Sequence, residues 1–209
     1  MDVSKNVASY LLQSKAIKLQ PANPFTWASG WKSPIYCDNR KTLSFIEIRS
    51  FIKNAFAETI KKEFGNFDVI AGVATGAIAQ GALVADILEK PFCYVRSAPK
   101  DHGLSNLIEG ELHAGQKVIV VEDLISTGGS SLKAVEAIRN AGAEVLGMVA
   151  IFTYGFPTAI ENFKKANVKL VSLSNYNALI ELAVEIGYVQ KDQTEILKKW
   201  REAPDKWGL

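Results

Sequence analysis

The 209-residue chain lacks several features that mark special classes of protein. It has two cysteines, Cys37 and Cys93, which are too far apart for a CxxC metal or redox pair and too few for a disulfide framework. No stretch approaches the roughly 18 apolar residues of a membrane span, and the first residues begin an amphipathic pattern in place of a secretory signal. We therefore expect a cytoplasmic protein with reduced, buried thiols and no membrane partner.

The chain also has little net charge and no compositional boundary. Its 24 Lys and Arg residues against 22 Asp and Glu leave a formal net charge of +2, which is too small to indicate a nucleic-acid partner. Any anion-binding site must therefore be local. No repeat, low-complexity tract or long linker divides the sequence, so we expect one domain over residues 1–209.

The most informative stretch that is present is a strand followed at once by acids, a polar turn and a helix. Residues 118–121 are an apolar, β-branched run without alternation, which is typical of a strand covered on both faces in a parallel sheet. Glu122 and Asp123 follow at its carboxyl end, and then comes a turn of Ser, Thr and Gly. Residues 132–138 have helical spacing, and Gly142 is the expected stop.

The polar turn suits a phosphate, because small hydroxyl residues and glycines at a helix start offer backbone N–H groups, O–H donors and the positive end of the helix dipole. The two acids suit adjacent hydroxyls, such as a ribose diol, or a hydrated Mg2+ shared with a phosphate. Together they indicate a sugar phosphate. The alternative is that Ser126 or Thr127 only caps the helix and that the acids are solvated. The turn is no Walker A loop, since no Gly-Lys-Ser/Thr sequence closes it.

Residues 118–131 resemble the 5-phosphoribosyl 1-diphosphate (PRPP) motif of the type I phosphoribosyltransferases, which consists of a hydrophobic strand, an acidic pair and a phosphate turn. The resemblance implies that the acids contact the ribose hydroxyls and that the turn from Ser126 to Ser130 holds the 5-phosphate. The substrate-binding residues that it implies here are Glu122, Asp123, Leu124, Ile125, Ser126, Thr127, Gly128, Gly129 and Ser130.

Residues 20–40, which we name the hood segment, are aromatic and rich in turn residues. Lys32 and Arg40 supply cations beside aromatic surfaces, a combination that suits a flat anionic ring. The alternative is an irregular structural cover anchored by Trp27 and Trp31. The segment resembles the N-terminal part of orotate phosphoribosyltransferases, which forms a hood over the base. That resemblance implies that Lys32 lies near orotate and the diphosphate.

About twenty residues with little periodicity separate a predicted strand at residues 92–95 from the next strand near Lys117. Their charged part, residues 96–106, indicates a lid, and a disordered basic surface loop is the alternative. It resembles the mobile catalytic loop of orotate phosphoribosyltransferases. The resemblance implies that Arg96, Lys100 and His102 bind the diphosphate, and that the catalytic residues are Lys100, Asp101, His102 and Asp123. Ser97 stands where some relatives have a Lys.

Residues 73–77 form a second turn of small residues, after a short predicted strand. Its backbone N–H groups could bind the diphosphate, although such a turn is equally an ordinary junction between a strand and a helix. Some relatives have a Lys here, where this chain has Thr75 and Gly76.

Tyr154 follows the fourth predicted strand, at the position where some relatives have an Arg for the orotate carboxylate. We therefore expect carboxylate recognition to rest on Ser126, Lys32 or Arg40.

The expected fold is α/β, with a mainly parallel sheet of about five strands flanked by helices and the ligand at the carboxyl ends of the strands. Residues 1–40 form an N-terminal helix and the hood. The first helix includes Val3, Val7, Tyr10, Leu11 and Ile17, a second covers residues 45–64, and two closing helices act as scaffold.

Because the three motifs occur in the family's order along nearly the whole chain, the resemblance implies transfer of 5-phosphoribosyl from PRPP to orotate, with orotidine 5'-monophosphate and diphosphate as products. It also implies Mg2+ bound mainly through PRPP, with no metal ligands set apart in the protein, and a homodimer whose lid loop is shared across subunits. Two rivals are a phosphoribosyltransferase for a purine or uracil and a non-catalytic PRPP-sensing regulator. The hood segment and the lid argue against the first, and the lid and the lack of a basic DNA-binding module against the second.

Overall fold

The computed structural model describes residues 2–27, 29–98 and 107–207. Their centre is a six-stranded sheet, which confirms the α/β prediction. Neighbouring strands are parallel except at the edge, where the last pair is antiparallel. In spatial order the strands are β10 (Leu170–Asn175), β9 (Glu144–Thr153), β8 (Lys117–Ile125), β5 (Val69–Val73), β6 (Phe92–Val95) and β7 (Ile108–Glu109).

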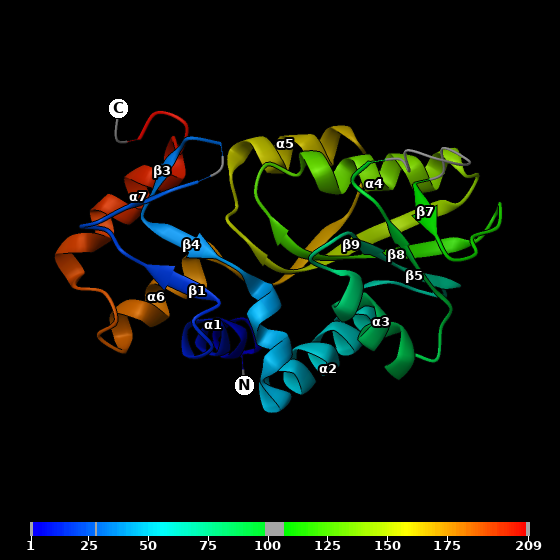
Figure 1. Cartoon of the computed structure of the whole chain (residues 1–209), viewed down its shortest axis with the longest axis horizontal. Helices are drawn as coiled ribbons and strands as arrows, with labels where there is room; N and C mark the ends of the chain where they lie inside the picture. Colours follow the sequence, from blue (N-terminus) through cyan, green and yellow to red (C-terminus); the bar gives the residue numbers. More distant parts are fainter. Residues whose placement is uncertain (1, 28, 99–106, 208–209) are drawn as a thin grey trace.

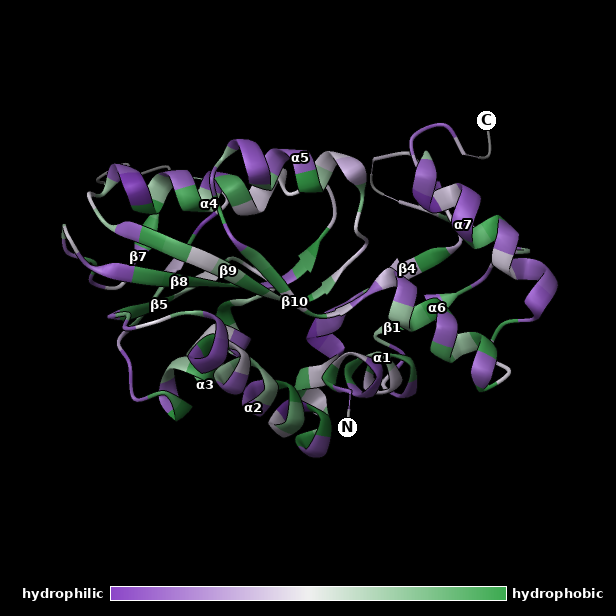
Figure 2. Ribbon diagram, turned by 180° about the vertical axis from the view of Figure 1, so that it is seen from behind, coloured by the Kyte–Doolittle hydropathy of each residue, from purple (hydrophilic) through white to green (hydrophobic). Residues whose placement is uncertain are grey.

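Helices cover both faces of this sheet (Figure 1). α4 (Gly129–Asn140) and α5 (Pro157–Lys165) lie on one side, and α2 (Ile46–Glu63) and α3 (Ile78–Ile87) on the other. The central strand β8 is apolar on both faces because both are covered, and residues 118–121 have no exposed surface. In Figure 2, which is coloured by hydropathy, the strands of this sheet are largely hydrophobic, whereas the helices carry both hydrophobic and hydrophilic residues.

The hood segment and the two ends of the chain gather at one end of the molecule (Figure 1). Two antiparallel pairs form the hood, β1 with β4 and β2 with β3, and the short helix η1 leads from it to α2. Beside it lie α1, α6 and α7. Their bounds are α1 (Val3–Gln13), β1 (Ile17–Leu19), β2 (Phe25–Thr26), β3 (Lys32–Ser33), β4 (Ile35–Cys37), η1 (Asn39–Ser44), α6 (Tyr176–Glu185), η2 (Lys191–Gln193) and α7 (Thr194–Glu202).

Three local predictions were wrong. Ile17 lies in β1 and not in the first helix, because α1 ends at Gln13 and Lys15 takes a left-handed conformation with φ 54°. A sixth strand, β7, occupies part of the stretch that was expected to hold none, and it pairs with β6 through only two residues. The acids lie within β8, which continues to Ile125, and do not follow it.

Within the described part of the chain, no helix is both long and apolar enough to span a membrane.

Candidate active site

Glu122 and Asp123 are neighbours on β8 in different surroundings. Glu122 is 4% exposed, and its carboxyl group accepts hydrogen bonds from Ser131 Oγ at 2.7 Å and from the backbone N–H of Asp123 at 2.8 Å. Burial, and then the negative charge of Asp123, raise the pKa of Glu122 to about 8. Asp123 is half-buried and lines a cavity. At neutral pH Glu122 is therefore mostly a neutral hydrogen-bonding group.

The turn at residues 126–130 includes the first two residues of α4, Gly129 and Ser130, and its hydroxyl groups are unused. The helix cap is Gly128, with φ 82° and no side-chain cap, so the alternative in which Ser126 or Thr127 caps the helix does not hold. A Cβ at Gly128 would lie 2.7 Å from the ring of Phe163, which excludes a larger residue. Among the described residues, none forms a hydrogen bond with the side chains of Ser126, Thr127 and Ser130. These hydroxyls are available to a ligand.

The acid pair faces the 73–77 turn across a cavity of about 280 Å³, which we name the acid-pair cavity. Gly76 is in direct contact with Asp123, since a Cβ on Gly76 would lie 2.3 Å from Asp123 Oδ2. Ser130 and the end of the hood segment complete the wall. A glycine at position 76 therefore lets a strand-end carboxylate approach the backbone of the second turn.

The end of the hood segment is tied to the acid pair by a buried amide. Asn39, 2% exposed, donates from Nδ2 to the backbone carbonyl of Asp123 at 2.6 Å and accepts from Cys37 Sγ at 3.1 Å. Next to it, Arg40 Nε donates to Asp38 Oδ1 at 2.6 Å, and this hydrogen bond raises the pKa of Arg40. The sequence contained no periodicity that would have singled out Asn39.

A second cavity, of about 310 Å³, lies under the hood and is named the hood cavity. It shares Cys37 and Leu124 with the acid-pair cavity, so the two adjoin. Trp27, Tyr36 and Tyr154 give it aromatic walls. The remaining lining residues are Thr26 and Ser126.

Ser126, which was predicted from the sequence, lines the hood cavity, and Lys32, which was also predicted, is hydrogen-bonded to a residue of the cavity wall. Lys32 Nζ donates to Thr26 Oγ1 at 2.8 Å, and Thr26 is part of the cavity wall. Arg40 lines the adjoining acid-pair cavity instead. The hood segment thus places Arg40 at the acid-pair cavity and Lys32 next to a wall residue of the hood cavity.

The closing helix α7 supports the hood, a role beyond the scaffold expected from the sequence. Trp200 has no exposed surface, and its indole N–H donates to the backbone carbonyl of Lys32 at 3.2 Å. Its ring packs edge-on against Trp27 and Tyr154, with centroids 5.5 and 5.6 Å away. The sequence signal was a lone Trp on the apolar side of a polar helix.

Of the lid residues, only the first three belong to the described part of the chain. Arg96 lies 3.4 Å from Glu109 Oε1 and lines a third cavity, of about 590 Å³, together with Ser97, Ser130 and Lys133. Lys100, Asp101 and His102 lie outside the described residues. Three adjoining cavities are lined by most of the predicted substrate-binding residues that are described, namely Arg96, Glu122, Asp123, Leu124, Ser126, Gly129 and Ser130. Lys32, Ile125, Thr127 and Gly128 line none of the three.

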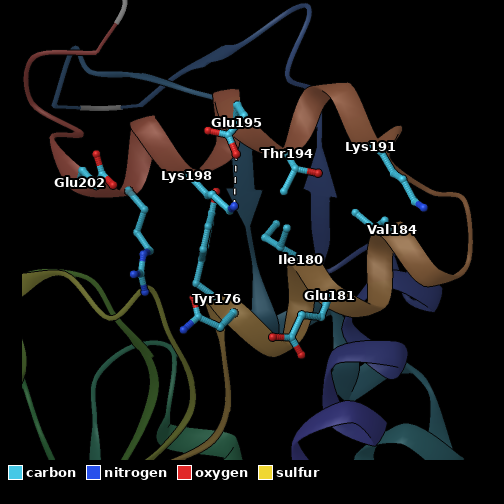
Figure 3. A pocket seen from close by; sticks show the side chains of 11 residues that line it. Tyr176, Ile180, Glu181, Val184, Lys191, Thr194, Glu195, Lys198 and Glu202 are labelled. Atoms are coloured by element: carbon cyan, nitrogen blue, oxygen red, sulfur yellow. Dashed lines mark hydrogen bonds and ion pairs between the residues drawn. The ribbon is translucent and has the colours of Figure 1, made fainter.

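A larger cavity, about 780 Å³, lies elsewhere, between α6 and α7 (Figure 3). None of the predicted site residues lines it. Figure 3 shows its mixed walls, with Ile180 and Val184 beside the ion pair of Lys198 and Glu195, whose atoms are 3.1 Å apart.

Comparisons with known proteins agree with this geometry. A family model described as phosphoribosyl transferase domain matches residues 41–185. The orotate phosphoribosyltransferase of Porphyromonas gingivalis is 64% identical over 207 residues, which are 99% of this chain and 99% of that protein. The one of Phocaeicola vulgatus is 63% identical over 98% of this chain and 97% of its own. The crystal structure of orotate phosphoribosyltransferase from Aeropyrum pernix has a TM-score of 0.74 at 29% identity, over 88% of this chain and 99% of that one.

Proposed function

The chain belongs to the phosphoribosyltransferase family and, within it, to the orotate phosphoribosyltransferases, and from this premise we propose how its residues divide the two substrates. As a member of this family it is a pentosyltransferase of pyrimidine biosynthesis, which transfers 5-phosphoribosyl from PRPP to orotate and releases diphosphate. The assignment of each substrate part to a cavity is our proposal.

The 126–130 turn holds the 5-phosphate in this proposal. Its free hydroxyls and the N–H groups at the start of α4 support this, because they offer several short donors at the positive end of a helix. Leu124 and Ile125 are the last two residues of β8 and connect it to the turn. Asp123 accepts from the ribose hydroxyls in the acid-pair cavity, and Glu122 completes the wall behind it.

The diphosphate lies between the 73–77 turn and the lid. Breaking the bond from ribose C1 to diphosphate leaves positive charge on the sugar and negative charge on the departing group. Arg96, Lys100 and His102 on the lid neutralise that negative charge and exclude water, which would otherwise hydrolyse the activated sugar. Asp101 belongs to the same catalytic loop. No covalent nucleophile is required, because orotate itself attacks.

Orotate occupies the hood cavity. Trp27 and Tyr36 form walls that suit a flat ring, and the ammonium group of Lys32 donates to Thr26, a residue of the cavity wall. The base end of the site thus carries a positive charge for an anionic base. The adjoining acid-pair cavity then presents ribose C1 to the base near Leu124.

Phosphoribosyltransferases generally use Mg2+ with PRPP, and we propose that here the ion is held mainly by PRPP oxygens. Asp123 fits a hydrated ion shared with ribose hydroxyls. The ion supplies neutralisation of the diphosphate charge when bound.

We further propose that residues 1–209 act as one domain, that two copies form a homodimer with each lid closing over the partner's 126–130 turn, and that the enzyme works in the cytoplasm without nucleic-acid or membrane partners. One continuous cluster of buried residues, from α1 to α7, supports the single domain. The free thiols of Cys37 and Cys93 suit a reducing compartment.

The observation that carries the proposal is the junction of the two cavities at Leu124 and Cys37, which brings a base pocket and a sugar pocket into contact. The test is an assay with PRPP and Mg2+ in which orotate, uracil, adenine and hypoxanthine are compared in parallel. We expect nucleotide formation with orotate alone. Turnover of another base in preference to orotate contradicts the base assignment, and PRPP binding without any turnover indicates a regulator.

A further inference from the structure

The side chain of Tyr154 is locked into an aromatic cluster. The residue is 2% exposed. Its ring stacks on Phe156 with a centroid distance of 5.3 Å and meets Phe152 and Trp200 edge-on at 5.7 and 5.6 Å. Trp27 closes the fourth side at 5.4 Å. A ring held by four others has little freedom to rotate, so its hydroxyl has a fixed position.

That hydroxyl has no hydrogen-bond partner in the described part of the chain. Among the described residues, Gln80 Oε1 is a side-chain polar atom that is fully buried and has no hydrogen-bond partner. The hydroxyl of Tyr154 is not fully buried in this way. Since Tyr154 lines the hood cavity, the accessible part of this buried residue includes the hydroxyl. A buried phenol normally finds a partner, because leaving it without one costs free energy.

The other polar groups near the hood cavity differ from Tyr154 in this respect. Lys32 already donates to Thr26, and Arg40 is held by Asp38 at the adjoining cavity. Ser126 is free but has a short, rotatable hydroxyl. Tyr36 also has a hydroxyl without a partner among the described residues, but this residue is 39% exposed. Tyr154 alone combines a buried, rigid position with an unused hydroxyl donor among the described residues that line this cavity.

We propose that the hydroxyl of Tyr154 donates a hydrogen bond to an acceptor oxygen of the pyrimidine and is a specificity-determining residue for the base. This extends the sequence expectation, in which recognition rested on Ser126, Lys32 or Arg40. It rests on the proposed function, since it requires the base to occupy the hood cavity.

The surroundings keep this donor protonated. Burial is the main cause that raises the pKa of Tyr154 well above its ordinary value, and the neighbouring Cys37 and Tyr176 add to it. The phenol therefore remains a neutral donor across the working pH range.

The test is Tyr154→Phe, which removes only the oxygen and retains the ring contacts. We expect the KM for orotate to rise about tenfold or more, as for a lost hydrogen bond to a charged or polarised acceptor, while the KM for PRPP stays within twofold. The melting temperature should not fall, because the oxygen has no partner in the folded chain.

Tyr176→Phe is the matched control. Tyr176 belongs to the same cluster, with its ring 5.6 Å from Trp200, but its hydroxyl donates to the backbone carbonyl of Leu197 at 3.0 Å and lines the α6–α7 cavity. This variant should lower the melting temperature and leave the orotate KM within twofold.

Three results overturn the inference. One is an unchanged orotate KM in Tyr154→Phe. Another is a melting temperature lowered as in Tyr176→Phe, with both KM values raised alike, which assigns the hydroxyl a structural role. The third is a wild-type enzyme that prefers another base, because then the proposed function has failed and the inference with it; orotate turnover by the wild type separates this case from the first two.

Discussion

Burial and hydrogen-bond partners explain why the two adjacent acids on β8 differ. Both residues line the acid-pair cavity, and the charge of Asp123 acts on the carboxyl group of Glu122. Glu122 turns toward Ser131 and is buried, whereas Asp123 turns toward Gly76. The two carboxyl groups are therefore not interchangeable, and each one has its own experimental signature.

The first signature is the pH dependence of stability. The pKa of Glu122 is about 8 in the folded chain against an ordinary 4.5, so between these values the folded state binds more protons than the unfolded state. Stability from this group is fully present below pH 4.5 and is lost as the pH rises through 8, with a slope of at most about 1.4 kcal/mol per pH unit. We expect Glu122→Gln to remove this loss of stability with rising pH.

The measurement is the free energy of unfolding of both proteins in denaturant at pH values from 5 to 8. The difference between variant and wild type should grow in favour of the variant as the pH rises. Two curves that run parallel over this range would mean that Glu122 titrates near its ordinary value.

The second signature is the contact of Asp123 with Gly76. In Gly76→Ala the new Cβ needs the space of the carboxylate, with 2.3 Å to Oδ2, so the carboxylate must move away from its position. We expect activity to fall about a hundredfold, on the order of 3 kcal/mol, with the fold retained. Gly65→Ala is the control, because no heavy atom lies within 4 Å of the Cβ it adds. Wild-type activity in both variants would argue that the position of Asp123 is not critical.

At the scale of elements, the hood cavity depends on α7 as much as on the hood segment. The bond from Trp200 to the carbonyl of Lys32 joins residues that are 168 positions apart. A helix at the end of the chain thereby holds the wall of a cavity formed near its beginning. Loss of the packing of α7 should therefore weaken the binding of the base more than the binding of PRPP.

Trp200→Leu tests this coupling. We expect stability to fall by about 3 kcal/mol, as for a large-to-small change at a fully buried site, and the KM for orotate to rise more than the KM for PRPP. Steady-state kinetics and thermal unfolding check both effects. Lys199→Ala, an exposed position on the same helix, should change neither. Equal increases in the two KM values would show general loosening and no specific support of the hood.

At the scale of the whole molecule, the site is a row of cavities along the carboxyl ends of β5, β6 and β8, with the hood at one end and the start of the lid at the other. This position is general for open α/β sheets, because the loops after parallel strands all emerge on one edge. A lid contributed by a partner subunit would close the row from outside.

Mixing two inactive variants tests lid sharing. If Lys100 and Asp123 of one site come from different subunits, a dimer of Lys100→Ala with Asp123→Asn has one doubly damaged site and one intact site. Random exchange makes about half of the dimers mixed, so about one quarter of wild-type activity should return. Activity that stays at the level of the parent variants, with exchange demonstrated by mass spectrometry of tagged chains, assigns the lid to its own subunit.

Short-range sequence patterns were sufficient to predict the central helices and strands. The uninterrupted apolar run of β8, the strand at residues 92–95 and the helix near 45–64 were all predicted from periodicity, because burial on one or two faces imposes a spacing that the sequence displays directly. The acid pair and the 126–130 turn were found the same way, since their residue types follow a strand and open a helix.

Contacts between distant segments required the folded chain. β7 has two residues and exists only because β6 offers an edge to pair with, and Ile17 leaves the helix pattern to pair with Cys37 of the hood. The hydrogen bond from Asn39 to the backbone carbonyl of Asp123 depends on the position of η1 relative to the sheet. Local spacing determined the strands and the polar turns, whereas long-range packing decided which carboxyl group of the acid pair has the raised pKa and which aromatic hydroxyl lies unpaired beside the hood cavity in the described part of the chain, because burial and neighbours set both properties.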